Sequence, residues 1–335
     1  MIRLKHKQHG LSLIELMIAV ALSIVLTLGV IQIFMSSKQT SRVQNSLARL
    51  QESARFALDL LAHDIRMAGQ LGCDSSITPT DNSGLLRPFG NGIFGYEYDG
   101  LPAVLITDNA SNPSSTKVIA GTDTIIVMAA ASNSISTQNN SSNVVRPAAG
   151  MNFSAIESGE PMLISDCENA DIFIADKQNN NKINTNLSKK YKDFSRLSPL
   201  TYSAYYIREN NNQRNLYRSR VNHSAGNTDI NTAPLLEGVE NMQILYGEDI
   251  NGDGSSIRYV DANTIAADMS KVISVRIHLL LATAEDNLAS SKQQYWYLNC
   301  DAGAPNTVAL CNANDRRLYR SFTTTVQLRN QGIGI

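Results

Sequence analysis

Two stretches of the sequence bring together side chains that could do chemistry, and the first could bind a cation. In DINGDG, residues 249–254, oxygen-bearing side chains alternate before a closing glycine, which is the order found in calcium-binding loops. The candidate ligands are the side chains of Asp249, Asn251 and Asp253 and the carbonyl of Ser255. The twelfth position, where such a loop needs a bidentate glutamate, is Val260. Ca²⁺ is thus the one cofactor that the sequence suggests, and we favour the alternative, an Asn-Gly/Asp-Gly turn between two strands.

The second stretch is HGLSLIELMIAVALSIVLTLGVIQIF, residues 9–34, an apolar run that contains a single acid, Glu15. As a helix, residues 11–35 are about 37 Å long, which is enough to cross a bilayer. The leader before Gly10 carries three basic residues and should stay on the cytoplasmic side, so that the rest of the chain is exported.

A carboxylate inside the apolar run is costly unless it has a partner. Cleavage of the chain after Gly10 would supply that partner, because the new amine of Leu11 would lie one helical turn from Glu15. Opposite charges could then neutralise each other within one chain or between neighbours that pack in register. The alternative is an uncleaved anchor, which leaves Glu15 unexplained.

The residues around this point resemble a known signature. A basic leader, Gly10, an apolar residue and then SLIELMIA, residues 12–19, are similar to the type IV prepilin signature. The resemblance implies that a prepilin peptidase cleaves between Gly10 and Leu11 and methylates Leu11, and that Glu15 guides subunit addition. Pilins usually begin with Phe after the cleavage site, and Leu11 departs from that pattern.

The helix is predicted to continue past the membrane. No proline occurs before Pro79, and apolar residues from Val43 to Ile65 recur at spacings of three and four, as in an amphipathic helix. Gly69 and Gly72 predict the end of a single helix of about 58 residues, roughly 87 Å long. We expect its second half to pack on the chain's own β-rich domain. The alternative, a two-stranded coiled coil, fits less well because the apolar stripe is short and broadens towards its end.

After Leu71, β-like runs alternate with connections rich in Asn, Ser and Gly. The predicted strands are 103–107, 124–128, 161–165, 171–175, 201–207, 272–284 and 321–330, and the predicted loops are 132–143, 179–186 and 210–215. In 272–284, the odd positions from Ile273 to Leu281 are expected to face the core and the even positions to face away. The fold class is therefore α+β, with a long N-terminal α-helix packed on an antiparallel, β-rich globular head, the type IV pilin-like fold that the resemblance implies.

Four further segments resemble PilW-type minor pilins. They are 54–69 (ARFALDLLAHDIRMAG), 165–173 (SDCENADIF), 246–262 (YGEDINGDGSSIRYVDA) and 315–330 (DRRLYRSFTTTVQLRN). The expected organisation is a leader peptide at 1–10, a transmembrane or filament-core half of the helix at 11–35, an amphipathic half at 36–70 and an exported β-rich head at 71–335.

The four cysteines all follow the membrane segment, and none forms a CxxC pair. This placement predicts disulfides in an oxidising compartment rather than a metal site. Four cysteines allow three pairings. We favour a local bridge between Cys300 and Cys311, which leaves Cys73 to pair with Cys167.

Composition and motifs argue against an enzyme and against nucleic acid as the main partner. The chain has 335 residues, 43% of them hydrophobic, and a net charge of −1. It has no GxSxG, no P-loop, no dinucleotide fingerprint and no histidine ligand pair. Two basic clusters could touch DNA or an acidic subunit, although we favour solvated strand edges: Arg316, Arg317 and Arg320 around Tyr319, and Lys189, Lys190 and Lys192. The run Tyr295, Trp296 and Tyr297 could form an adhesive patch, although we favour core packing beside a disulfide.

The resemblance implies a minor pilin that primes type IV pilus assembly and reaches the pilus tip, with roles in twitching motility, adhesion or DNA uptake. Its implied partners are the prepilin peptidase, other minor pilins and the major pilin, the inner-membrane assembly platform, a tip adhesin and inner-membrane lipid. The implied location is the inner membrane, as a single-pass protein with a periplasmic head, and then the pilus. The alternatives are a pseudopilin of a type II secretion machine and a pilus-borne adhesin or DNA receptor.

Overall fold

The computed structural model describes most of the chain beyond the N-terminal leader. The described residues are 12–70, 80–81, 92–97, 119–166, 168–211, 213–224, 227–254, 257–265, 269–300 and 306–329. The chain divides into two compact units, Met1–Arg49 and Leu50–Ile335, and the second of these contains all the strands.

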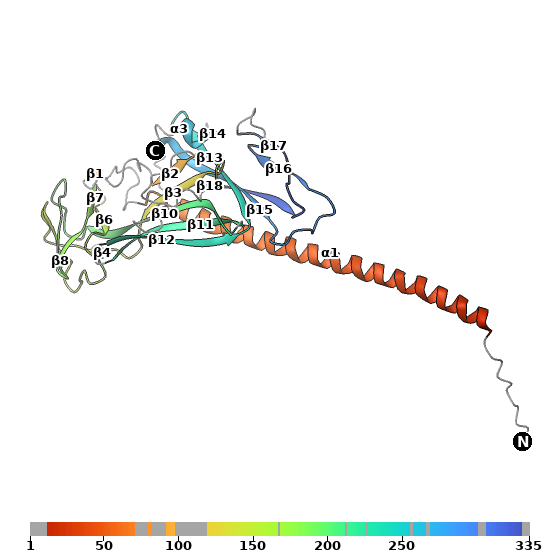
Figure 1. Ribbon diagram of the computed structural model, residues 1–335. Helices are drawn as coiled ribbons and strands as arrows, with labels where there is room; N and C mark the ends of the chain where they lie inside the picture. Colours follow the sequence, from red (N-terminus) through yellow and green to blue (C-terminus); the bar gives the residue numbers. More distant parts are fainter. Residues whose placement is uncertain are drawn as a thin grey trace, which may run out of the picture. The chain divides into compact units, whose positions relative to one another are not determined.

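The predicted long helix is confirmed as α1, which runs from Leu13 to Met67 over 55 residues and is drawn in red and orange in Figure 1. It ends where the sequence predicts, because Gly69 adopts a φ of 69° that only glycine takes without strain. Within the second unit the buried face of α1 consists mainly of small residues alternating with branched ones. These residues are Leu50, Ala54, Ala57, Leu61, Ala62 and Ile65.

Two sheets dominate the second unit, and among the described residues the larger one has nine strands. Its main path runs β1 (Thr80–Asp81), β7 (Ala170–Ile174), β6 (Pro161–Ser165), β10 (Arg196–Asn210), β11 (Gln213–Ser224) and β12 (Asn227–Glu237). The strands β2 (Ile93–Tyr96), β3 (Thr124–Ala130) and β4 (Ile135–Ser136) branch from this path, because the long β10 pairs with β6 and β4 near its start and with β3 and β11 further on.

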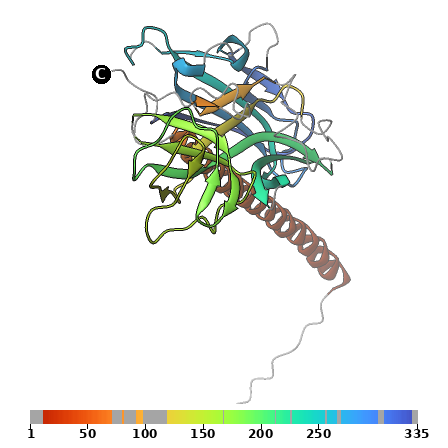
Figure 2. The same ribbon diagram turned by 90° about the vertical axis from the view of Figure 1, so that its left-hand side faces the viewer.

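The second sheet has the order β14 (Ile257–Val260), β13 (Val239–Asp249), β15 (Val272–Ala282) and β18 (Tyr319–Gln327), with every pairing antiparallel. Two smaller sheets are formed by β16 (Gln294–Leu298) with β17 (Val308–Asn312), and by β5 (Val144–Val145), β9 (Lys182–Asn184) and β8 (Asp176–Asn179). The short helices α3 (Ala262–Ile265) and η2 (Met269–Lys271) connect β14 to β15. Figure 2 shows the green strands of the first large sheet beside the blue strands of the second.

One hydrophobic core joins the buried face of α1 to both large sheets, which confirms the predicted α+β class. A polar contact also ties the helix to the sheet, because the hydroxyl of the buried Tyr205 on β10 donates a hydrogen bond to the carboxylate of Asp64 on α1. Burial, and then the charge of Asp64, raise the pKa of Tyr205, so its hydroxyl keeps the proton that it donates.

Most strand predictions are confirmed, whereas three predicted loops need correction. The strand predicted at 161–165 is β6, and the strands predicted at 124–128, 171–175, 201–207, 272–284 and 321–330 overlap β3, β7, β10, β15 and β18. The predicted loops at 132–143 and 179–186 contain β4 and β9, because these polar residues find backbone partners in distant segments. The predicted loop at 210–215 is too long, because β11 already begins at Gln213. The strand predicted at 103–107 lies outside the described residues.

The predicted core-facing side of β15 is confirmed, and the structure adds that the other side is covered as well. Val275, Ile277 and Leu279 face the main core, whereas Leu280 and Ala282 belong to a second hydrophobic cluster. Tyr297 on β16 and Cys311 on β17 supply part of that second cluster. The β16–β17 hairpin thus covers the second face of β15.

A buried acid joins the start of β3 to the second large sheet. Asp123 Oδ2 accepts the Ile244 N–H at 2.6 Å, and Glu97 accepts the Ala262 N–H at 3.1 Å nearby. Burial, and then the neighbouring Glu97 carboxylate, raise the pKa of Asp123 well above its ordinary value. Above pH 4 the unfolded chain therefore loses this proton before the folded chain does, and the contribution of Asp123 to stability falls as the pH rises.

We expect the Asp123→Asn variant to remove this loss, because asparagine cannot ionise and still offers an oxygen to the Ile244 N–H. Urea unfolding of wild type and variant measures the free energy of unfolding at pH 4.5 and pH 7. The variant's free energy of unfolding should increase relative to that of the wild type, on the order of 1 kcal/mol, between the two pH values. Asp59→Asn, at an exposed position on α1, controls for the loss of one charge. A difference between Asp123→Asn and wild type that is the same at both pH values would contradict the assignment.

Candidate assembly site

The candidate assembly site lies at the start of α1, where the described residues begin. The Ser12 N–H donates to Glu15 Oε2 at 3.3 Å, and the Glu15 N–H donates to Ser12 Oγ at 3.2 Å. These two reciprocal bonds form a capping box, which satisfies two of the backbone donors that a helix leaves unpaired at its start. The Ser-x-x-Glu spacing in the sequence is a signal for this cap, and our sequence analysis missed it.

Glu15 therefore has a local role beside the predicted one. Its carboxylate is exposed in the isolated chain, at a helix N-terminus where a negative charge is favoured. Gly10 and Leu11, the residues of the predicted cleavage site, lie outside the described residues. The pairing of the Leu11 amine with Glu15 stays a prediction.

The first unit presents a continuous apolar surface. Large hydrophobic side chains from Leu13 to Met35 keep between 47% and 77% of their area exposed. The hydroxyls that interrupt this run are satisfied inside the helix, since Ser23 donates to the Val20 carbonyl at 2.8 Å and Thr27 to the Ser23 carbonyl at 2.7 Å. Among the described residues α1 is the one helix that is long and apolar enough to cross a membrane. Such a surface can be stable only in lipid or among other helices.

The DINGDG stretch forms the connection between β13 and β14, as the turn interpretation predicts. The Asp249 carboxylate accepts backbone N–H groups from Asn251 at 3.2 Å, Gly252 at 2.8 Å and Gly254 at 2.7 Å. Ser255 lies outside the described residues, and the twelfth position, Val260, pairs with Tyr246 in the sheet. The described part of the chain contains no cluster of three His, Cys, Asp or Glu side chains that could hold a metal. The Asp249 carboxylate thus bonds to the backbone of its own loop, and calcium binding stays an untested prediction.

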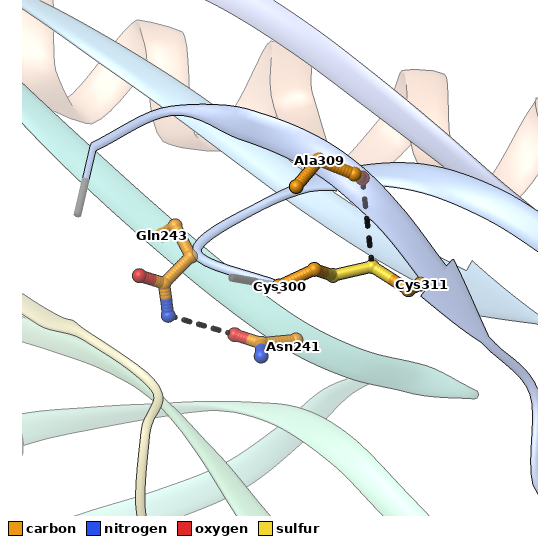
Figure 3. Close-up of a disulfide and its surroundings, with 5 residues drawn as sticks. All are labelled: Asn241, Gln243, Cys300, Ala309 and Cys311. Atoms are coloured by element: carbon orange, nitrogen blue, oxygen red, sulfur yellow. Dashed lines mark hydrogen bonds between the residues drawn. A yellow bond between two sulfur atoms is a disulfide. The ribbon is translucent and has the colours of Figure 1, made fainter. Parts of the chain in front are cut away.

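The structure contains a disulfide between Cys300 and Cys311, the local bridge that the sequence favours, and Figure 3 shows it beside Asn241 and Gln243 of β13. Polar contacts hold the hairpin on the second sheet, since Asn299 Nδ2 donates to Gln243 Oε1 at 2.6 Å and the Tyr297 hydroxyl to the His278 carbonyl at 2.9 Å. Cys73 and Cys167 lie outside the described residues, so the second predicted bridge stays a prediction.

The aromatic run before this disulfide is divided between two faces of the hairpin. Tyr297 is buried and Tyr295 stacks on Tyr319, which agrees with the predicted core packing. Trp296 instead points outward with 62% of its area exposed, opposite Leu310 on β17. Core packing is therefore wrong for Trp296, because alternation along β16 turns it to the outer face.

Several cations of the two basic clusters have intramolecular partners. Lys189 pairs with Asp166 at 3.3 Å and Lys192 with Glu168 at 2.6 Å. Arg317 pairs with Asp315 and with Glu240, both at 2.6 Å. These contacts agree with the preferred interpretation of solvated, locally neutralised edges.

Comparison with known protein families matches two models to this chain. A prokaryotic N-terminal methylation motif matches residues 5–31, and the type IV pilus-assembly protein W family, PilW, matches residues 204–330. The chain therefore carries a prokaryotic N-terminal methylation motif near its start and a PilW domain in its second half. The methylation motif covers the second half of the leader and most of the apolar run, and the PilW match extends from within β10 to just beyond β18. Both sequence resemblances are thereby confirmed.

The chain was also compared with curated proteins and with solved structures. The search of curated proteins found no match. A type IV-like pilin from Thermus thermophilus is similar in structure over 85% of this chain and 99% of its own, with 12% identity and a TM-score of 0.31.

Proposed function

We propose that this protein is a minor pilin of a type IV pilus, made as a prepilin and cleaved between Gly10 and Leu11, with methylation of the new Leu11 amine. The matches to the methylation motif and to the PilW family support this proposal. Before assembly, residues 11–35 anchor the chain in the inner membrane with the head in the periplasm. After assembly, the same residues lie in the filament.

The observation that carries the proposal is the exposed apolar surface of α1 from Leu13 to Met35, with one acid at its start. Burial among neighbouring helices replaces lipid contacts along this surface, so transfer into a filament keeps it away from water. Burial alone does not select one register along a smooth apolar rod. Attraction between the Leu11 amine and Glu15 of the same or a neighbouring subunit sets that register.

The proposed partners follow from this mechanism. A prepilin peptidase processes the chain, and the inner-membrane assembly platform receives it. Other minor pilins and the major pilin pack against its apolar helix, and together the minor pilins prime pilus growth. A place at the pilus tip, beside an adhesin, agrees with a large head carried on a single helix.

The proposal is tested by intact-mass measurement and N-terminal sequencing of protein taken from membranes and from sheared pili. We expect a mature chain that begins at Leu11 and carries one additional methyl group, present in both fractions. A Gly10→Asp variant, which places a charged side chain at the cleavage site, should keep the leader and be absent from sheared pili. A wild-type chain that still begins at Met1 in membranes and pili would overturn the proposal, because α1 would then be an ordinary anchor.

A further inference from the structure

A polar cavity of about 350 Å³ opens in the head where β11, β13, β16 and β18 meet the segment 313–318. Its volume lies at the lower end of the range for small-molecule sites. The stacked rings of Tyr295 and Tyr319, with centroids 4.9 Å apart, form one part of its wall. Most of the remaining wall consists of charged and amide side chains.

The charges in this wall largely neutralise one another. Arg317 donates to Glu240 and to Asp315 at 2.6 Å each, and Arg214 Nε lies 4.0 Å from Glu240 Oε2. Although burial disfavours its charged form, the hydrogen bonds that Arg317 donates to Glu240 and Asp315 raise its pKa. Although burial favours its neutral form, hydrogen bonds from Arg317 lower the pKa of Asp315. The network is thus internally paired, so an anionic ligand finds no cation without a partner among the described residues of this wall.

The uncommitted groups of the wall are side-chain amides and one carboxylate. The side chains of Glu209 and Asn314 form no hydrogen bond or ion pair with any other residue in the described ranges. Asn312 accepts a bond from Gln294, and Asn241 accepts one from Gln243, so both keep amide N–H donors. The cavity therefore presents donors and acceptors close together, beside an aromatic wall.

We propose that this cavity binds a neutral saccharide unit. Each sugar hydroxyl both donates and accepts, so it can bond to an amide donor and to a carboxylate acceptor at once. An apolar ligand would leave these polar groups without partners, at a cost in free energy. The apolar face of a sugar ring can also lie against Tyr295 or Tyr319. This site is independent of the proposed assembly role, which rests on α1.

The experiment uses the full-length protein in a detergent without sugar groups. Glucose, galactose, mannose and N-acetylglucosamine are added at millimolar concentration, and binding is followed by saturation-transfer NMR. The same signal, followed as the sugar concentration is raised, gives the dissociation constant of any sugar that binds. We expect at least one of these sugars to bind and Asn314→Ala to weaken its binding about threefold to tenfold, the value of one hydrogen bond.

Two further variants provide a control for the substitution and a test of the ligand class. Asn180→Ala, an exposed asparagine in the turn between β8 and β9, is the matched control and should bind as the wild type does. Glu209→Gln keeps an oxygen acceptor, so it should change sugar binding by less than about threefold, which is smaller than the loss of a hydrogen bond. Circular dichroism confirms that each variant is folded.

Three results would overturn the inference. The first is no saturation transfer from any of the four sugars. The second is sugar binding that Asn314→Ala leaves unchanged, which would place the sugar elsewhere on the protein. The third is binding of Nα-acetyl-lysine amide, whose side chain is cationic, that Glu209→Gln abolishes. This result would assign the cavity to a cationic side chain of a partner protein. The first result does not affect the proposed assembly role, because that role is tested by cleavage of the leader and by incorporation into pili.

Discussion

The Glu15→Ala variant is expected to be exported and cleaved as the wild type is, and to be reduced about tenfold or more in sheared pili relative to membranes. Loss of the carboxylate leaves the Leu11 amine as an unpaired charge among apolar helices, which costs several kcal/mol, roughly the penalty for breaking a buried ion pair. Quantitative immunoblots of the two fractions, normalised to the major pilin, measure the effect. Normal incorporation of the variant would count against the pairing mechanism.

The capping box requires two companion variants, because Glu15 also bonds to the backbone of Ser12. Glu15→Gln keeps an oxygen for the Ser12 N–H but carries no charge, whereas Ser12→Ala removes the hydroxyl that caps the Glu15 N–H. If the charge sets the register, Glu15→Gln should be reduced in sheared pili to the same extent as Glu15→Ala. Ser12→Ala should cost the helix about 1 kcal/mol and leave incorporation near the wild-type level. The reverse ranking would make capping the main role of Glu15.

The second large effect is expected in the head, where Gly92→Ala should destabilise the fold by about 3 kcal/mol or more. Gly92 has a φ of 76°, and a Cβ built there would overlap the backbone N and Cα of Gly69, just after α1. Both glycines bond to Met128 on β3, whose carbonyl accepts the Gly69 N–H at 3.0 Å and whose N–H donates to the Gly92 carbonyl at 2.7 Å. The added methyl group must therefore push apart Gly69, just after α1, and Gly92, just before β2.

Gly121→Ala provides a matched control for this variant. Gly121 has a φ of 74°, close to that of Gly92, but a Cβ at this position meets no atom within 4 Å. It should therefore show the left-handed backbone cost alone, about 1–2 kcal/mol. Thermal or urea unfolding of the two variants isolates the steric part. Equal losses of stability in the two variants would show that the contact with Gly69 is unimportant.

Part of the candidate site could be predicted from the sequence, because the patterns that indicate it involve residues close together in the chain. Glu15 and the apolar run are close in sequence, and the same few residues contain the Ser-x-x-Glu spacing that predicts the cap. The Asn-Gly/Asp-Gly turn after β13 was readable for the same reason, since one aspartate caps the backbone of its own loop. The Cys300–Cys311 bridge closes a short segment, which also made it the natural choice.

Other features could not be read because they depend on residues that are far apart in the chain. Asp123 is buried because it bonds to Ile244, 121 residues away, and no local pattern marks that contact. The cavity wall combines β11, β13, β16 and β18, so its residues are scattered over the second half of the sequence. Alternation along β16 would have placed Trp296 apart from Tyr295 and Tyr297, but only the covering of β15 shows which face is exposed.

The sequence by itself determined the long helix, the order of most strands and the acid at the start of the apolar run. The physical reason is that helical and strand periodicities, caps and turns depend on neighbours within a few residues. Only the tertiary structure decided that β15 is covered on both faces, that two glycines let α1 lie against β3, and that paired charges surround a polar cavity. These depend on which surfaces meet, and contacts between distant segments leave no periodic trace in the chain.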